Sequence, residues 1–220
     1  MTNGMNFFKK FQNAPRKKVT LASALLAAAA ITLGCVTYIS FFQKDGLDKL
    51  PAKPCHGAIS RETIRKMLKD TESVDLRTFQ TKPDASFWTT CNVFTQEGSG
   101  FHVEARINDS GIPRWREWQL SQGEDEGKPV IDFKAGDRAI SWPRRASLYL
   151  KCTPELEKDK PSEQYAIAIE THIRGSMRID GEELRQTLAN IAIEMAHYAQ
   201  RKVKCQEKTY LPAPGHPVPS

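Results

Sequence analysis

The chain has 220 residues and a formal net charge of +6 at pH 7, and 40% of its residues are hydrophobic. Five of its 32 basic residues precede residue 19, which leaves 27 basic against 26 acidic side chains in the nearly neutral remainder. A groove for DNA or RNA requires lysine and arginine clustered on the folded domain, so we expect no nucleic-acid partner.

The first predicted element is a membrane anchor at residues 19–42, an uncharged and mostly apolar stretch. Its 24 residues would form a helix about 36 Å long, enough for a hydrocarbon core of about 30 Å. The five basic residues before it have no acidic residue among them, which favours a cytoplasmic N-terminus. We therefore predict a cytoplasmic segment at 1–18, a transmembrane helix at 19–42 in contact with membrane lipid, and an extracytoplasmic remainder.

Two other interpretations of this stretch stay open. A cleaved signal peptide has an apolar region of only about 7 to 15 residues, and here the apolar character continues through Phe42. A lipoprotein is the second alternative, because Leu33-Gly34-Cys35 resembles the end of a lipobox. Thr32 departs from that pattern, so we expect Cys35 to be a small apolar residue of the helix.

The remainder predicts one domain at 55–208. Residues 43–54 contain two prolines and balanced charges without periodicity, which is typical of a linker. Residues 209–220 are rich in proline, and we expect them to be disordered.

Two helices and four strands are predicted within this domain. Ser60 is a plausible N-cap for a short helix near residues 60–70, and a pair of strands follows at 87–94 and 100–107. Two more strands are expected at 146–152 and 165–173, and a long helix follows Asp180, which can cap its first turn. The fold class is therefore α+β, an antiparallel sheet with two packed helices, preceded by one transmembrane helix.

Cys55, Cys91, Cys152 and Cys205 all follow the predicted anchor, and an even number of cysteines in an oxidising compartment predicts disulfides. Three pairings are possible. The element pattern favours Cys55 with Cys91 and Cys152 with Cys205, because each pair then joins a helix to a strand of its own half. We expect no metal site, since no CxxC pair occurs and only His56 lies beside a cysteine.

The segment Ile112–Gln119 is the candidate binding surface, with Arg114, Trp115, Arg116 and Trp118. Arginine and tryptophan are common anchors of binding surfaces, and the tryptophans could stack on a sugar or a peptide. The alternative is that one or both tryptophans fill the core while the arginines remain in water.

Pro54-Cys55, a helix, the cysteine-bearing strand Thr89–Val93 and an alternating strand together resemble the actinobacterial DUF3558-type extracytoplasmic domains, over residues 54–108. This resemblance implies a small domain anchored outside the membrane. The family has no known activity, so the resemblance implies no functional residue.

No HExxH, GxSxG or Walker-type motif occurs, and the five histidines are scattered along the sequence. We interpret His102 and His172 as solvated residues on the outward side of strands. We therefore expect no enzyme and no cofactor, but a binding, sensing or protein-interaction module of the cell envelope with a protein or glycan ligand. The alternatives are an envelope hydrolase or transferase with a site assembled from scattered residues, and a structural subunit of a membrane assembly.

Overall fold

The computed structural model describes residues 46–108, 111–122, 127–159 and 165–214. The cytoplasmic segment 1–18, the transmembrane helix predicted at 19–42 and Cys35 lie outside these residues. Within the described part of the chain, none of the helices combines the length and the apolar character that crossing a membrane requires. The anchor therefore stays a prediction from the sequence.

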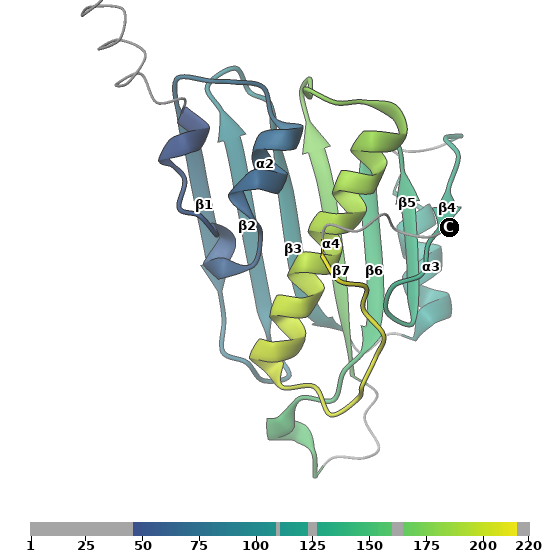
Figure 1. Cartoon of the computed structure of the whole chain (residues 1–220). Coiled ribbons are helices and arrows are strands. Elements are labelled where there is room, and N and C mark those ends of the chain that lie inside the picture. Colours follow the sequence, from purple (N-terminus) through teal and green to yellow (C-terminus); the bar gives the residue numbers. More distant parts are fainter. Residues whose placement is uncertain (1–45, 109–110, 123–126, 160–164, 215–220) are drawn as a thin grey trace, which may run out of the picture. The chain divides into compact units, whose positions relative to one another are not determined.

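The described residues form one sheet of seven antiparallel strands in the order β1-β2-β3-β7-β6-β5-β4 (Figure 1). The bounds of the strands are β1 Val74–Gln80, β2 Trp88–Thr95, β3 Gly100–Asn108, β4 Ile131–Asp132, β5 Arg138–Trp142, β6 Arg145–Lys151 and β7 Ala166–Arg174. The four strands predicted from the sequence correspond to β2, β3, β6 and β7, which occupy the centre of the sheet. The three strands that the sequence did not predict are the two edge strands, β1 and β4, and β5 beside β4.

Alternation in β3 and β7 sets the two faces of the sheet. Phe101, Val103 and Ala105 are buried on one face, and Ile167 and Ile169 of β7 join them there. On the other face, β3 carries His102, Glu104 and Arg106, while β7 carries the buried Ala168 followed by Glu170 and His172. Because side chains alternate along a strand, this pattern holds both strands in register.

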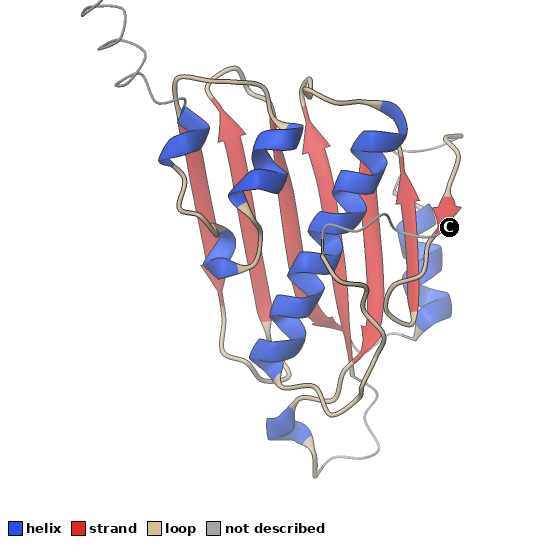
Figure 2. Cartoon of the chain, viewed as in Figure 1, coloured by secondary structure: helices blue, strands red, loops and turns tan. Residues whose placement is uncertain are grey.

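Helices lie on both faces of this sheet (Figure 2). α2 (Arg61–Met67) and the long α4 (Gly181–Val203) cover the apolar face. α3 (Ile112–Leu120) lies on the opposite face, where it packs against β6 and covers only part of that face. Two helices were predicted, and α3 is the third. Three short 3-10 turns complete the elements of the described residues: η1 (Gly46–Lys49), η2 (Cys55–Gly57) and η4 (Glu155–Glu157).

The two predicted caps differ. The side chain of Ser60 accepts a hydrogen bond from the backbone N–H of Thr63 at 3.0 Å, so the predicted cap of α2 is confirmed. Asp180 occupies the N-cap position of α4, but its side chain makes no capping hydrogen bond. The start of α2 is also held by the buried Glu194 of α4, because its carboxylate accepts hydrogen bonds from Ser60 N and Thr63 Oγ1.

Both disulfides have the favoured pairing. Cys55 in η2 is joined to Cys91 in β2, and Cys152 after β6 is joined to Cys205 after α4. All four cysteines belong to the apolar core or pack against it. The two disulfides indicate an oxidising, extracytoplasmic environment.

The predicted boundaries of the domain need correction. Leu47 and Leu50, in the segment predicted as a linker, are 0% and 6% exposed in the core. At the other end, Pro212 O accepts a hydrogen bond from the His197 ring at 2.8 Å, within the tail predicted to be disordered. The folded domain therefore extends at least from residue 46 to residue 212, since local composition does not report burial by distant elements.

Candidate functional site

The face of the sheet opposite α4 is only partly covered by the described residues. α3 covers it over β5, β6 and the start of β7, where Trp115, Trp142 and Tyr149 form a small second core. Beyond α3, the outward side chains of β1, β2, β3 and β7 remain accessible. We call this part the open face.

The predicted binding surface is divided by this arrangement. Trp115 is 1% exposed in the second core and is not available to a ligand, as in the alternative in which one tryptophan fills the core. Arg116 forms an ion pair with Asp132 at 3.1 Å, while Arg114 is exposed. Only Trp118 reaches the open face. Side chains three residues apart lie on the same side of a helix, so Trp115 and Trp118 point in similar directions. Both would be buried only if other elements covered a larger part of the surface of α3.

Trp118 belongs to a row of exposed aromatic and arginine side chains that crosses the open face. Trp88 of β2 and Arg106 of β3 are direct register partners, and the Arg106 guanidinium lies 5.3 Å from the centre of the Trp118 ring. Phe79 of β1 packs edge-on against Trp88 with ring centres 5.1 Å apart. Phe79, Trp88 and Trp118 are 48%, 43% and 40% exposed. We call Phe79, Trp88, Arg106 and Trp118 the aromatic row.

A pair of carboxylates lies beside the aromatic row, where Glu104 of β3 faces Glu170 of β7 in register. Arg106 reaches both of them, with N–O distances of 3.8 and 3.7 Å. The hydrogen bond from His102 lowers the pKa of Glu104, and Arg106 acts in the same direction. Burial, followed by the charge of Glu104, raises the pKa of Glu170. The two facing carboxylates therefore differ in their tendency to ionise.

Two histidines are the next register pair along the same strands. The rings of His102 and His172 lie 4.9 Å apart between their centres. His102 lies between two acceptors, since its Nδ1 is 2.7 Å from Asn92 Oδ1 and its Nε2 is 3.7 Å from Glu104 Oε2. His172 is exposed and His102 is partly buried, so the prediction of two solvated histidines holds only for His172.

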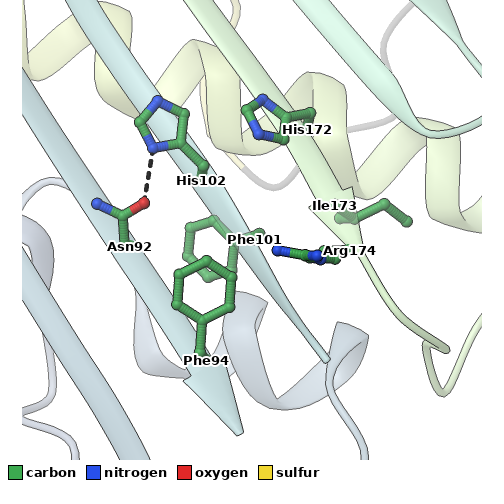
Figure 3. Close-up of a pocket in the computed structure, with 7 residues that line it drawn as sticks. All are labelled: Asn92, Phe94, Phe101, His102, His172, Ile173 and Arg174. Atoms are coloured by element: carbon green, nitrogen blue, oxygen red, sulfur yellow. Dashed lines mark hydrogen bonds between the residues drawn. The ribbon is translucent and has the colours of Figure 1, made fainter. Parts of the chain in front are cut away.

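The histidines line a depression of about 460 Å³, together with Asn92, Phe94, Phe101, Ile173 and Arg174 (Figure 3). Phe94 lies across β3 because its register partner is Gly100. A Cβ atom on Gly100 would come within 2.4 Å of Phe94 Cδ1 and 2.2 Å of Val93 O, so only glycine fits there. Arg174, at the end of β7, adds an exposed guanidinium.

Metal binding finds no further support. No group of three or more histidine, cysteine, aspartate or glutamate side chains converges on one point in the described part of the chain. All four cysteines after the predicted anchor are in disulfides. The acidic residues Glu124 to Glu126 lie outside the described residues.

Sequence reasoning missed most of this site. His102 and His172 were recognised as outward residues, but their pairing depends on β3 and β7 being neighbours, which the sequence does not state. Glu104, Glu170 and Arg106 were missed for the same reason. A signal for α3 was present, since Pro113 stands in its first turn, where proline is favoured.

Fold and site together define a disulfide-bonded α+β domain with an accessible, aromatic and charged sheet face. Comparison of the chain with protein-family models, with curated proteins and with solved structures finds no match. The resemblance to DUF3558-type domains therefore stays a prediction.

Proposed function

We propose that this protein is a membrane-anchored extracytoplasmic binding module that binds an envelope glycan on its open face. Residues 19–42 are the anchor in this proposal. The observation that carries it is the aromatic row, because three large aromatic side chains are 40 to 48% exposed side by side. Contiguous exposed apolar surface is typical of interaction sites.

The chemistry beside the aromatic row favours a glycan over a purely apolar ligand. Aromatic rings offer a flat apolar face on which the C–H face of a sugar ring can stack. Glu104, Glu170 and Arg106 provide acceptors and donors for hydroxyl groups.

A second candidate, an envelope glycoside hydrolase, is favoured by one observation. The pKa values of the facing residues Glu104 and Glu170 are shifted in opposite directions, as in pairs of carboxylates that act as acid and base. Against it, neither glutamate lines the depression, whereas hydrolases bind their substrates in clefts with converging polar groups. Both carboxylates also lie near Arg106, which would hold them in place rather than free them for proton transfer.

The experiment is a titration of the full chain in detergent with a neutral β-1,4-linked N-acetylglucosamine tetrasaccharide. Intrinsic fluorescence reports binding at the aromatic row, because Trp88 and Trp118 are exposed while Trp115 and Trp142 are buried. We expect Trp88→Ala and Trp118→Ala each to weaken binding at least about tenfold, the typical loss at an aromatic hot spot.

The matched control is Tyr210→Ala, which removes an exposed aromatic side chain of the C-terminal segment outside the aromatic row. It should bind as the wild type does. Equal binding by all three variants, or no binding by the wild type, would rule out the proposed glycan site. Release of shorter saccharides during the titration would favour the hydrolase instead.

The anchor is tested separately by mass spectrometry of the chain extracted from membranes. An intact N-terminus before residue 19 with an unmodified Cys35 supports the transmembrane helix. A chain that begins at a lipid-modified Cys35, or after residue 42, would replace it with a lipoprotein or a secreted protein.

A further inference from the structure

We infer that the depression beside the aromatic row is an oxyanion subsite, which binds a carboxylate or phosphate group of the ligand through Arg174 and His172. That this group belongs to a glycan rests on the proposed function. The subsite itself rests on the geometry of the depression.

Arg174 is the first observation. It is exposed at the end of β7 and lines the depression, and its guanidinium forms no ion pair or hydrogen bond with the side chains of the described residues (Figure 3). Three other arginines near the open face are engaged: Arg77 with Asp75, Arg106 with two glutamates and Arg144 with the carbonyl oxygen of Gly175. Arg174, which lines the depression, therefore offers an available guanidinium for a planar oxyanion.

The second observation is the set of donors around the same hollow. His172 is exposed and lies two residues before Arg174 on the same face of β7. Asn92 also lines the hollow, with its Oδ1 2.7 Å from His102 Nδ1. Phe94 forms an apolar wall and brings no negative charge.

The charges that face the two histidines come from three strands. Glu104 on β3 lies near His102, and Glu170 on β7 is two residues from His172. Arg106 on β3 lies close to both glutamates and offsets their charge. On β6, the register partner of His172 is Arg145, which is buried and donates to Gln119. Positive charge therefore exceeds negative charge at the Arg174 end of the depression.

The depression and the aromatic row lie on one continuous surface. His102 and Arg106 are four residues apart on β3, which corresponds to about 13 Å at 3.3 Å per residue. A single extended ligand can therefore reach both. The ligand class that fits is an acidic oligosaccharide, whose sugar rings stack on the aromatic row while its acidic group enters the depression.

The test compares two tetrasaccharides with the full chain: the neutral N-acetylglucosamine tetramer and a hyaluronan tetrasaccharide, which carries glucuronate carboxylates. We expect the wild type to bind the acidic probe about tenfold more tightly. Arg174→Gln should remove this preference and leave binding of the neutral probe unchanged. The matched control, Arg77→Gln on the same face, should keep the preference, because Arg77 already pairs with Asp75.

Two further readouts separate a specific subsite from general charge. Inorganic phosphate, with sodium chloride at equal ionic strength as reference, should compete with the acidic probe and not with the neutral one. The preference for the acidic probe should also be smaller in His172→Gln than in the wild type.

The outcomes distinguish the two proposals. Equal binding of both probes by the wild type, or an unchanged preference in Arg174→Gln, would overturn the subsite and leave the glycan site standing. If neither probe binds, the proposed function fails, and phosphate-induced shifts of the His172 ring signals in an NMR titration decide the subsite alone. Absence of shifts, or equal shifts in Arg174→Gln, would overturn it.

Discussion

The two faces of the sheet differ in the polarity and the burial of their side chains. On the face below α2 and α4, most inward side chains of the central strands are apolar and buried, and both disulfides lie there. On the open face, the same strands carry histidine, glutamate, arginine and tryptophan, many of them exposed.

This difference separates the side chains that stabilise the domain from those that remain available for binding. Burial of apolar area is the main source of folding free energy, and the α4 face supplies it. The charged residues of the open face contribute little in comparison, because exposed ion pairs are worth about 1 kcal/mol or less. Their clustering therefore favours a role in binding rather than in folding.

The largest expected effect on the free energy of unfolding comes from comparing substitutions at two residues of β7 whose side chains point to opposite faces. Ile169 is 0% exposed in the main core, and Ile169→Ala should lower the free energy of unfolding by about 2–5 kcal/mol through lost burial and a cavity. His172→Ala, three residues along on the open face, should cost less than about 1 kcal/mol. Urea denaturation of both variants measures the contrast. Equal losses would mean that the open face is part of the stabilising core.

Removal of the disulfides is the next test of how the α4 face contributes to stability. Replacing Cys152 and Cys205 together by serine should cost about 2–4 kcal/mol, mainly because the unfolded chain regains freedom. The Cys55 and Cys91 pair closes a shorter loop, with a separation of 36 residues against 53, and should cost about 0.3 kcal/mol less in the chain-entropy model. Thermal unfolding with and without a reductant provides the measurement. Wild-type stability that is indifferent to reductant would contradict this assignment.

The smallest effects should occur within the open face, where Glu104→Gln and Glu170→Gln are expected to have opposite signs. The folded state lowers the pKa of Glu104, so its contribution to stability is present above the unfolded pKa and is lost as the pH falls. Glu104→Gln should therefore destabilise the domain at pH 7, by about 1 kcal/mol, the net value of a typical hydrogen bond.

For Glu170, stability depends on pH in the opposite direction. Its pKa is raised in the folded state, so stability is favoured below the unfolded pKa and is lost as the pH rises through the folded pKa. Glu170→Gln should stabilise the domain at pH 7, and both differences from the wild type should shrink at pH 3.5. Urea denaturation at the two pH values measures them. Destabilisation by both variants at pH 7 would show that the ion pairs with Arg106 outweigh the burial of Glu170.

The central part of the fold could be predicted because its signals are local. Alternation in β3 and β7, the long apolar stripe of α4 and the Ser60 cap each depend on neighbours within a few residues. The edge strand β1 was missed because four of its seven residues are exposed, so its alternation is weak. β4 has only two residues and gives no pattern at all.

The candidate site was not predictable in the same way. Trp115 and Trp118 have the same chemistry in the sequence, and only the position of α3 against β6 buries one and exposes the other. The pairs His102 with His172 and Glu104 with Glu170 form because β3 and β7 are neighbours in the sheet. No local preference encodes which distant strand becomes a neighbour.

The sequence by itself determined the α+β class, the central elements and the favoured cysteine pairing, because periodicity, capping and cysteine position act over short stretches of chain. It also predicts the membrane anchor, through length, apolar character and basic flank. The tertiary structure alone decided which face stays open and which side chains meet on it. That choice follows from the packing of α4 on one face and of α3 on part of the other, and packing between elements distant in sequence is decided by the whole core at once.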